Sequence, residues 1–256
     1  MKCAYDLSVV VPGIRNEHWE TLRDHMKHAC KKYSYEIIFS GPHALPESLQ
    51  KELNVKYIKN YGNPSRAFHL GTRIADGRWV CILADDAHLY HDSIDKTLDL
   101  LNENNPDKDI AVLRYCEGEH HSGAEPPMGY WTAGYHGDTK QPGINPAWKL
   151  SLTPMVSLKY YNELGGIDCL YEHVNFNMID FGFRATKNGS NILLSPTLVM
   201  NCDFEPNRTA ESHSVINAYE NNDRDLFFKM YADNNRSIKI EENWQVSEPV
   251  WKRKKY

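Results

Sequence analysis

Two adjacent carboxylates, Asp85 and Asp86, follow directly on a strongly apolar stretch at residues 79–83. Like charges this close together are costly unless a positive group neutralises them. Mg²⁺ and Mn²⁺ prefer carboxylate oxygens and are often shared with the phosphates of a substrate. The doublet therefore predicts a site for a divalent cation and a diphosphate, with a capping pair in a strand-to-helix turn as the structural alternative.

Two arginines, Arg15 and Arg66, lie in predicted loops near the same expected site. A guanidinium can hold a diphosphate through two parallel hydrogen bonds, so both are candidates for binding it. Solvated arginines are the alternative. Residues 128–136 combine aromatic rings with glycines, which is typical of a lid that closes over a sugar, although a loop packed on the core fits equally well.

The elements that must position these groups alternate along the first half of the chain. Apolar runs predict strands at residues 7–11, 36–39, 55–58, 79–83 and 110–115. Apolar residues at three- and four-residue steps predict helices over residues 19–33, after a cap at Ser65 with Gly77 at the end, and after a cap at Asp92. This alternation implies an α/β fold with a mostly parallel, doubly wound sheet. Ligands of such sheets bind beyond the carboxyl ends of the strands, where Pro12, Ser40 and the doublet fall.

The second half of the chain is less regular. Helical patterns are predicted at residues 159–164, at 178–187 before Gly189, and at 212–235. We expect one domain over residues 1–212, with a nucleotide-binding half at 1–109 and an acceptor half at 110–212, and a helical extension at 213–256.

Five landmarks resemble the family 2 glycosyltransferases in the order in which they occur. They are the strand 7–12, the Asn/Gly-rich turn at 60–67, the Asp85-Asp86 doublet, the Gly-Gly-Ile-Asp segment within 164–168, and Asp180 four residues before Arg184. The resemblance implies a GT-A fold and an inverting transfer of a sugar from a nucleotide-diphosphate donor, a UDP-sugar, to a glycan hydroxyl with Mn²⁺ or Mg²⁺. The stretch 62–66 also resembles glycosyltransferase-like proteins of large-genome viruses and phages.

The resemblance also implies roles for individual residues. The family's Asp-x-Asp motif places Asp86 as the metal ligand, and His213 is suitably placed to complete the coordination, with a surface or helix-start histidine as the alternative. Ser40 stands where the family has an Asp that reads uracil, so the base is left open. The residues expected around the donor are Pro12, Gly13, Arg15, Glu17, Ser40, Arg66, Asp85 and Asp86.

An inverting enzyme needs a carboxylate within hydrogen-bond reach of the attacking hydroxyl. In the family this base belongs to a Glu-Asp pair ahead of the helix that carries Asp180, but those positions hold Asn177 and Met178 here. Neither side chain can accept a proton, so the base must be displaced. Asp180 is the first candidate and Glu172 the second, while an ion pair between Asp180 and Arg184 is the structural alternative.

Composition argues against a nucleic-acid-binding protein and against a membrane-spanning one. The chain has 256 residues, with 29 basic against 34 acidic side chains and no long basic block, so a nucleic-acid partner is not expected. The N-terminal apolar run is too short for a signal peptide or a membrane span, which predicts a cytoplasmic protein. The basic run at 252–255 could touch an anionic membrane, but a solvated tail is favoured.

Two other functions compete with the transferase. A nucleotidyltransferase would share a similar sheet and acidic metal site, but residues 12–17 lack its Gly-rich, Lys/Arg-bearing first loop. A nucleotide-sugar or glycan-binding protein without a catalytic base would fit Ala84, Asn177 and Met178.

Overall fold

The computed structural model describes residues 3–117, 153–202, 218, 222–231 and 236–246. The predicted lid at 128–136 and His213 lie outside these ranges. Within them, no helix is both long and apolar enough to cross a bilayer. All six cysteines carry free thiols, and only Cys3 is exposed.

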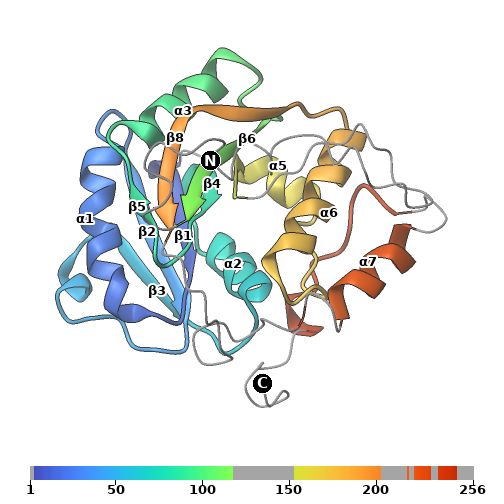
Figure 1. The fold of residues 1–256 in the computed structure, drawn as a ribbon, viewed down its shortest axis with the longest axis horizontal. Coiled ribbons are helices and arrows are strands. Elements are labelled where there is room, and N and C mark those ends of the chain that lie inside the picture. The colour runs from blue at the N-terminus through green and yellow to red at the C-terminus, as the bar shows by residue number, and fades with distance from the viewer. Residues whose placement is uncertain (1–2, 118–152, 203–217, 219–221, 232–235, 247–256) are drawn as a thin grey trace.

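A single mixed sheet organises the described residues (Figure 1). Its strand order is β3-β2-β1-β4-β7-β6-β8-β5. The pairs β3–β2, β2–β1, β1–β4 and β6–β8 are parallel, whereas β7 pairs antiparallel with both of its neighbours and β5 with β8. The strands are β1 (Tyr5–Pro12), β2 (Tyr35–Gly41), β3 (Val55–Lys59), β4 (Gly77–Ile82), β5 (His88–Leu89), β6 (Ile110–Glu117), β7 (Pro154–Ser157) and β8 (Ile192–Cys202).

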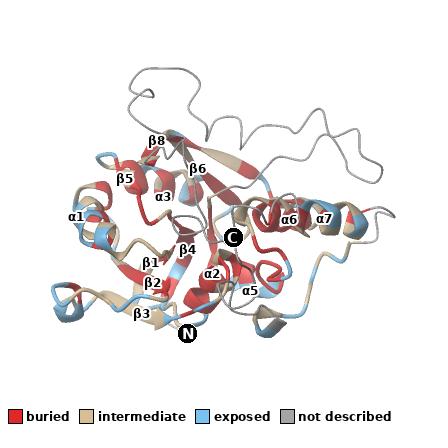
Figure 2. Cartoon of the chain, turned by 60° about the horizontal axis from the view of Figure 1, so that its bottom comes forward, coloured by how far each residue is buried: buried red, intermediate tan, exposed pale blue. Residues whose placement is uncertain are grey.

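Helices cover both faces of this sheet, which confirms the doubly wound α/β fold expected from the sequence (Figure 1). One apolar core lies under α1 and α3, and a second lies under α2, α5 and α6. A smaller aromatic cluster joins α7 to α6. The sheet and the inward helix faces are buried, and the outer faces are exposed (Figure 2). The helices are α1 (Trp19–Ala29), α2 (Pro64–Arg73), α3 (Ser93–Glu103), α5 (Leu158–Glu163), α6 (Val174–Lys187) and α7 (Arg224–Tyr231), with 3-10 turns at Asn16–His18, Leu49–Lys51 and Trp244–Val246.

The start of α2 differs from the prediction. Asn63, not Ser65, caps the helix, because its side chain accepts a hydrogen bond from the Arg66 backbone N–H at 2.8 Å and Pro64 occupies the first turn. The helix stops at Arg73, so Gly77 does not end it and instead begins β4. A Cβ on Gly77 would lie 2.5 Å from the Ser8 backbone nitrogen, which explains why glycine stands there.

Asp92 does precede α3, but it does not cap the helix with its side chain. Its backbone is left-handed, with φ at 56°, and no side-chain cap hydrogen bond forms. The carboxylate instead pairs with the Lys31 Nζ at 3.0 Å. Asp92 therefore ties the start of α3 to the chain that follows α1.

Four histidines join α1 to the chain around β5. The ring centroids of His25 lie 5.2 Å from those of both His28 and His88, and the His28 ring stacks on His91 at 4.3 Å. The Nδ1 atom of His25 accepts a hydrogen bond from the Leu89 backbone N–H at 3.2 Å. Burial lowers the pKa of His25, and the neighbouring imidazoles of His88 and His28 lower it further, against the opposing charge of Asp24.

This cluster makes stability depend on pH. Because the pKa of His25 lies below its ordinary value of 6.5 in the folded protein, the unfolded chain takes up the proton first as the pH falls. The contribution of His25 to the free energy of unfolding is therefore intact above about pH 6.5 and is lost as the pH falls below it.

In urea titrations at pH 7.5 and 5.5, His25→Asn should lose less stability between the two pH values than the wild type. The exposed His43 provides the control, His43→Asn, which should lose as much as the wild type; an equally steep loss in His25→Asn would contradict this account.

Candidate functional site

The acidic doublet lies at the carboxyl end of β4, beside the loop that follows β1. The two strands are paired in parallel, with Val10 opposite Ile82, so their ends meet at the same edge of the sheet. The backbone N–H groups of Ile14 and Arg15 each donate to Asp85 Oδ2 at 3.0 Å. Asp85 and Asp86 are only 5% and 7% exposed, so the fold holds both carboxylates in a nearly closed environment.

One side chain, Arg15, neutralises both carboxylates. Its Nε donates to Asp85 Oδ1 at 3.0 Å, and its Nη2 contacts the same oxygen. Its Nη1 lies 3.2 Å from Asp86 Oδ2. The positive group that the charge argument requires is thus supplied by the chain itself, as a charge-assisted bridge between two loops.

Two glycines allow the loop after β1 to approach the neighbouring strand ends closely. A Cβ on Gly13 would lie 2.7 Å from the Cβ of Asp85, and a Cβ on Gly41 would lie 1.9 Å from the Gly13 carbonyl oxygen. The Gly13 N–H donates to the Ser40 carbonyl at 3.1 Å. Pro12, Gly13, Arg15 and Ser40 therefore meet the doublet at one edge of the sheet, as the sequence predicts.

Ser40, one residue before the end of β2, has a buried side chain, and its hydroxyl finds no hydrogen-bond partner among the described residues. A buried hydroxyl without a partner is costly, at about 1–3 kcal/mol. A ligand that formed a hydrogen bond with this hydroxyl would remove that cost.

The contacts of the doublet decide whether it can hold Mn²⁺ or Mg²⁺ in this arrangement. Both oxygens of Asp85 already accept hydrogen bonds from the first loop, and Asp86 Oδ2 faces the Arg15 guanidinium. The part of the chain that the structure describes contains no group of three or more His, Cys, Asp or Glu side chains able to hold a metal. As arranged, the doublet fits a guanidinium and does not fit a divalent cation.

The other two residues expected at the donor have different surroundings. The Glu17 side chain is 66% exposed and lies 3.9 Å from His18. The Arg66 Nε donates to the Trp244 carbonyl at 3.0 Å, its guanidinium stacks over the Trp244 ring, and its Nη1 contacts Asn60. Arg66 thus fastens the C-terminal segment 236–246 to α2, and this engagement disfavours it as a diphosphate ligand.

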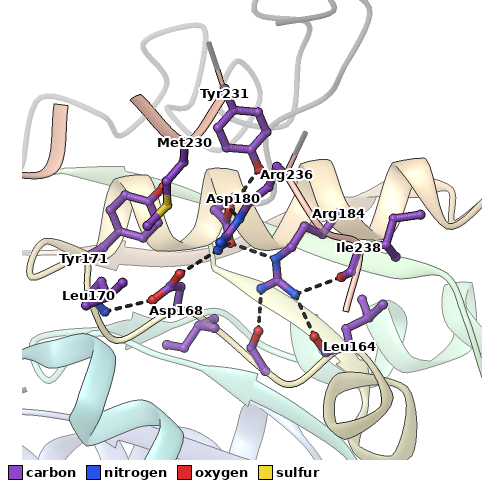
Figure 3. Close-up of polar contacts among 12 residues, drawn as sticks. Leu164, Asp168, Leu170, Tyr171, Asp180, Arg184, Met230, Tyr231, Arg236 and Ile238 are labelled. Atoms are coloured by element: carbon purple, nitrogen blue, oxygen red, sulfur yellow. Dashed lines mark hydrogen bonds and ion pairs between the residues drawn. The ribbon is translucent and has the colours of Figure 1, made fainter. Parts of the chain in front are cut away.

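Asp180, the first candidate for the base, lies in a buried ion-pair network (Figure 3). Its side chain is fully buried, and Arg184 Nε donates to its Oδ2 at 2.8 Å. Arg236 Nε and the Tyr231 hydroxyl donate to its Oδ1 at 2.7 and 2.8 Å. Arg236 continues to Asp168 at 2.6 Å, so the network ties α6 to α7, the 164–168 segment and the C-terminal segment.

The charges around Asp180 make it a poor base. Burial would raise its pKa, but the charges and hydrogen bonds of Arg184 and Arg236 outweigh burial and hold the pKa below its ordinary value. A general base works best with a pKa near the working pH and must reach the acceptor hydroxyl. The geometry therefore favours a structural role for Asp180 over a role as the base, and the alternative ion pair between Asp180 and Arg184 is present in the structure.

Glu172, the second candidate, lies in the loop just before α6. Its side chain is 4% exposed, and its backbone N–H donates to Asp223 Oδ1 at 2.9 Å. The His173 N–H donates to Asp223 Oδ2 at 2.6 Å. Asp223 therefore clamps the backbone that carries Glu172, although no local sequence pattern marks Asp223 as a site residue.

The two carboxylates also interact electrostatically. Burial raises the pKa of the Asp223 carboxyl, the backbone N–H bonds from Glu172 and His173 oppose that rise, and the nearby charge of Glu172 adds to it. A buried pair of carboxylates of this kind is a recurring arrangement at sites of proton transfer.

Together, the mostly parallel sheet with helices on both faces and the acidic doublet at its carboxyl edge define a domain of the GT-A type. The sequence model of Glycosyl transferase family 2 matches residues 8–146, and the chain belongs to this family. No curated protein matches the sequence. The likeness to viral and phage proteins stays a prediction.

Solved structures of Staphylococcus aureus TarS share the fold. TarS residues 1–349 match with a TM-score of 0.56 at 16% identity, over 77% of this chain and 60% of that one. The UDP-GlcNAc complex of the same TarS segment matches with a TM-score of 0.59 at 16% identity, over 90% of this chain and 68% of that one. The UDP complex matches with a TM-score of 0.56 at 17% identity, over 78% and 61% of the two chains. The chain thus spans about three-fifths of the TarS segment in the first of these matches.

Proposed function

We propose that the protein transfers a sugar from a UDP-sugar to a glycan hydroxyl by direct displacement, which inverts the anomeric configuration. The observation that carries this proposal is the Arg15–Asp85–Asp86 cluster at the carboxyl edge of the sheet. Membership of the glycosyltransferase family supports it, as do the TarS structures of the same fold solved with UDP and UDP-GlcNAc.

In this proposal Arg15 faces the donor's diphosphate. The charge that develops on the departing nucleoside diphosphate needs a positive partner, and Arg15 is a preorganised one because Asp85 holds it through both backbone and side chain. The Ser40 hydroxyl, which has no partner in the part of the chain that the structure describes, offers one hydrogen bond to the nucleotide base. Mn²⁺ or Mg²⁺ at Asp86, with His213, stays a proposal and requires Arg15 to release Asp86 first.

Glu172 is the base in this proposal. It takes the proton from the acceptor hydroxyl while that oxygen bonds to the anomeric carbon and the bond to the diphosphate breaks. The clamp from Asp223 to the Glu172 and His173 backbone fixes the position of the base. Asp180 keeps a structural role because its carboxylate is held by two arginines.

A binding protein without turnover is the second candidate function. Asn177 and Met178 occupy the positions at which the family carries its Glu-Asp pair, and both are buried. The Asn177 amide donates to the Ser65 hydroxyl, so it serves the packing of α6 against α2.

One experiment separates the two functions. The purified protein is incubated with a panel of nucleotide sugars and glycan acceptors, with and without Mn²⁺, while nucleotide release and thermal shift are followed. The transferase should release UDP in an acceptor-dependent reaction. A nucleotide-dependent thermal shift with no release of nucleotide from any donor would establish the binding protein instead.

A further inference from the structure

We propose that Arg15 is a built-in counterion that closes the acidic doublet to divalent cations until a diphosphate draws its guanidinium away. The inference rests on the proposed function for the identity of that diphosphate, but its first part concerns the donor-free protein alone. The contacts that the doublet makes do not match the metal site expected from the sequence.

Arg15 and a cation at Asp86 exclude each other. The Arg15 Nη1 lies 3.2 Å from Asp86 Oδ2, so a cation bound to that oxygen would sit beside a fixed positive charge. Two like charges that share one carboxylate repel each other strongly in a site that is nearly closed to water. Asp85 cannot replace Asp86 as the ligand, because its two oxygens accept hydrogen bonds from Arg15 and the first loop.

The loop after β1 holds the Arg15 guanidinium beside the doublet even without a ligand. The same residue, Asp85, binds the backbone N–H and the side chain of Arg15. Gly13 lies against Asp85 so closely that a Cβ would reach 2.7 Å from the Asp85 Cβ. The guanidinium is therefore anchored through Asp85, and its contact with Asp86 is the one that an incoming group can exchange.

A diphosphate is the group suited to that exchange. Phosphate oxygens accept two parallel N–H bonds from a guanidinium just as the oxygens of a carboxylate do. The Arg15 side chain is 15% exposed, so a ligand can reach it. When the guanidinium turns to a phosphate, the positive charge beside Asp86 Oδ2 moves away, and its repulsion of a cation at that oxygen is removed. Because coupling between two ligands is reciprocal, nucleoside diphosphate and cation should then strengthen each other's binding.

The test measures Mn²⁺ binding to the full chain by electron paramagnetic resonance without nucleotide. The wild type should bind Mn²⁺ only weakly, and Arg15→Gln should bind it at least about tenfold more tightly because a unit positive charge is removed beside Asp86. Arg23→Gln is the matched control: Arg23 is similarly buried, at 16% against 15% exposure, but pairs with Asp24 and Glu52 on another part of the chain. This control should leave Mn²⁺ affinity unchanged. Arg15→Lys, which keeps the charge, should stay close to the wild type.

Three results would overturn the inference. They are tight Mn²⁺ binding by the donor-free wild type, equal Mn²⁺ affinity in the wild type and Arg15→Gln, and an equal gain in Arg23→Gln. The first needs no variant and so holds even if Arg15→Gln fails to fold. A UDP titration of the wild type is run separately: absence of UDP binding would count against the proposed function and the coupling, while the Mn²⁺ comparison would still decide whether Arg15 closes the doublet.

Discussion

Replacing Glu172 by glutamine is expected to lower kcat for sugar transfer by about 10²–10⁴-fold, the usual contribution of a general base. The amide keeps the size of the side chain but cannot take the acceptor's proton. Because Glu172 is buried in the loop before α6 and is held through its backbone by Asp223, donor binding at the doublet should not change. Steady-state kinetics at saturating donor measure the first effect, and calorimetric titration with UDP measures the second.

Two further variants make this result interpretable. Glu163→Gln removes a half-exposed carboxylate on α5 and should leave kcat at the wild-type value. Asp223→Asn keeps an oxygen that can accept the Glu172 N–H but cannot also accept the His173 N–H, so it should lower kcat by displacing Glu172 while leaving the affinity for UDP unchanged. Full transfer activity in Glu172→Gln would rule out Glu172 as the base.

The second large effect concerns stability. Arg184→Leu should lower the free energy of unfolding by about 3–5 kcal/mol, because removing one partner of a buried ion pair leaves the other charge poorly compensated. Arg184 is fully buried, pairs with Asp180 at 2.8 Å, and also donates to the Leu164 carbonyl at 2.9 Å. The Leu164 carbonyl therefore loses a donor as well. Urea unfolding at neutral pH measures the change.

The chain contains a matched control for that prediction. Lys159 and Glu163 form an ion pair with the same four-residue spacing, but their side chains are 85% and 49% exposed and the atoms lie 3.8 Å apart. Glu163→Gln should therefore change stability by less than about 0.5 kcal/mol. If Arg184→Leu costs no more than this control, Asp180 is not held by the network as Figure 3 shows it.

The fold of residues 1–109 was predictable because its elements repeat a simple pattern. Continuous apolar runs mark β1, β2 and β4, which are buried on both faces, and the apolar stripe of α1 follows the helical period. Parallel strands bring their carboxyl ends together, so the proximity of Pro12, Ser40 and the doublet follows from the pattern alone. Three strands were not predicted: β5 is two residues long, β7 is four residues long, and β8 contains Pro196 and several half-buried positions.

The site was less predictable because its contacts join residues far apart in the chain. The charge argument correctly requires a positive partner for Asp85 and Asp86, but it cannot choose between a cation and an arginine that lies 70 residues away. The pairing of Asp223 with the Glu172 backbone spans 51 residues and leaves no periodic signal. Arg66 lies in the first turn of α2 and not in the predicted loop, and the direction of its side chain depends on Trp244, 178 residues further on.

A crystal structure of the wild type soaked with UDP tests the central claim most directly. The account predicts that the diphosphate lies at the carboxyl edge of β1 and β4, against Arg15, with Asp85 still held by the N–H groups of Ile14 and Arg15. Nucleotide bound elsewhere on the protein, or an edge that stays empty at saturating UDP with Arg15 still bridging both carboxylates, would contradict it.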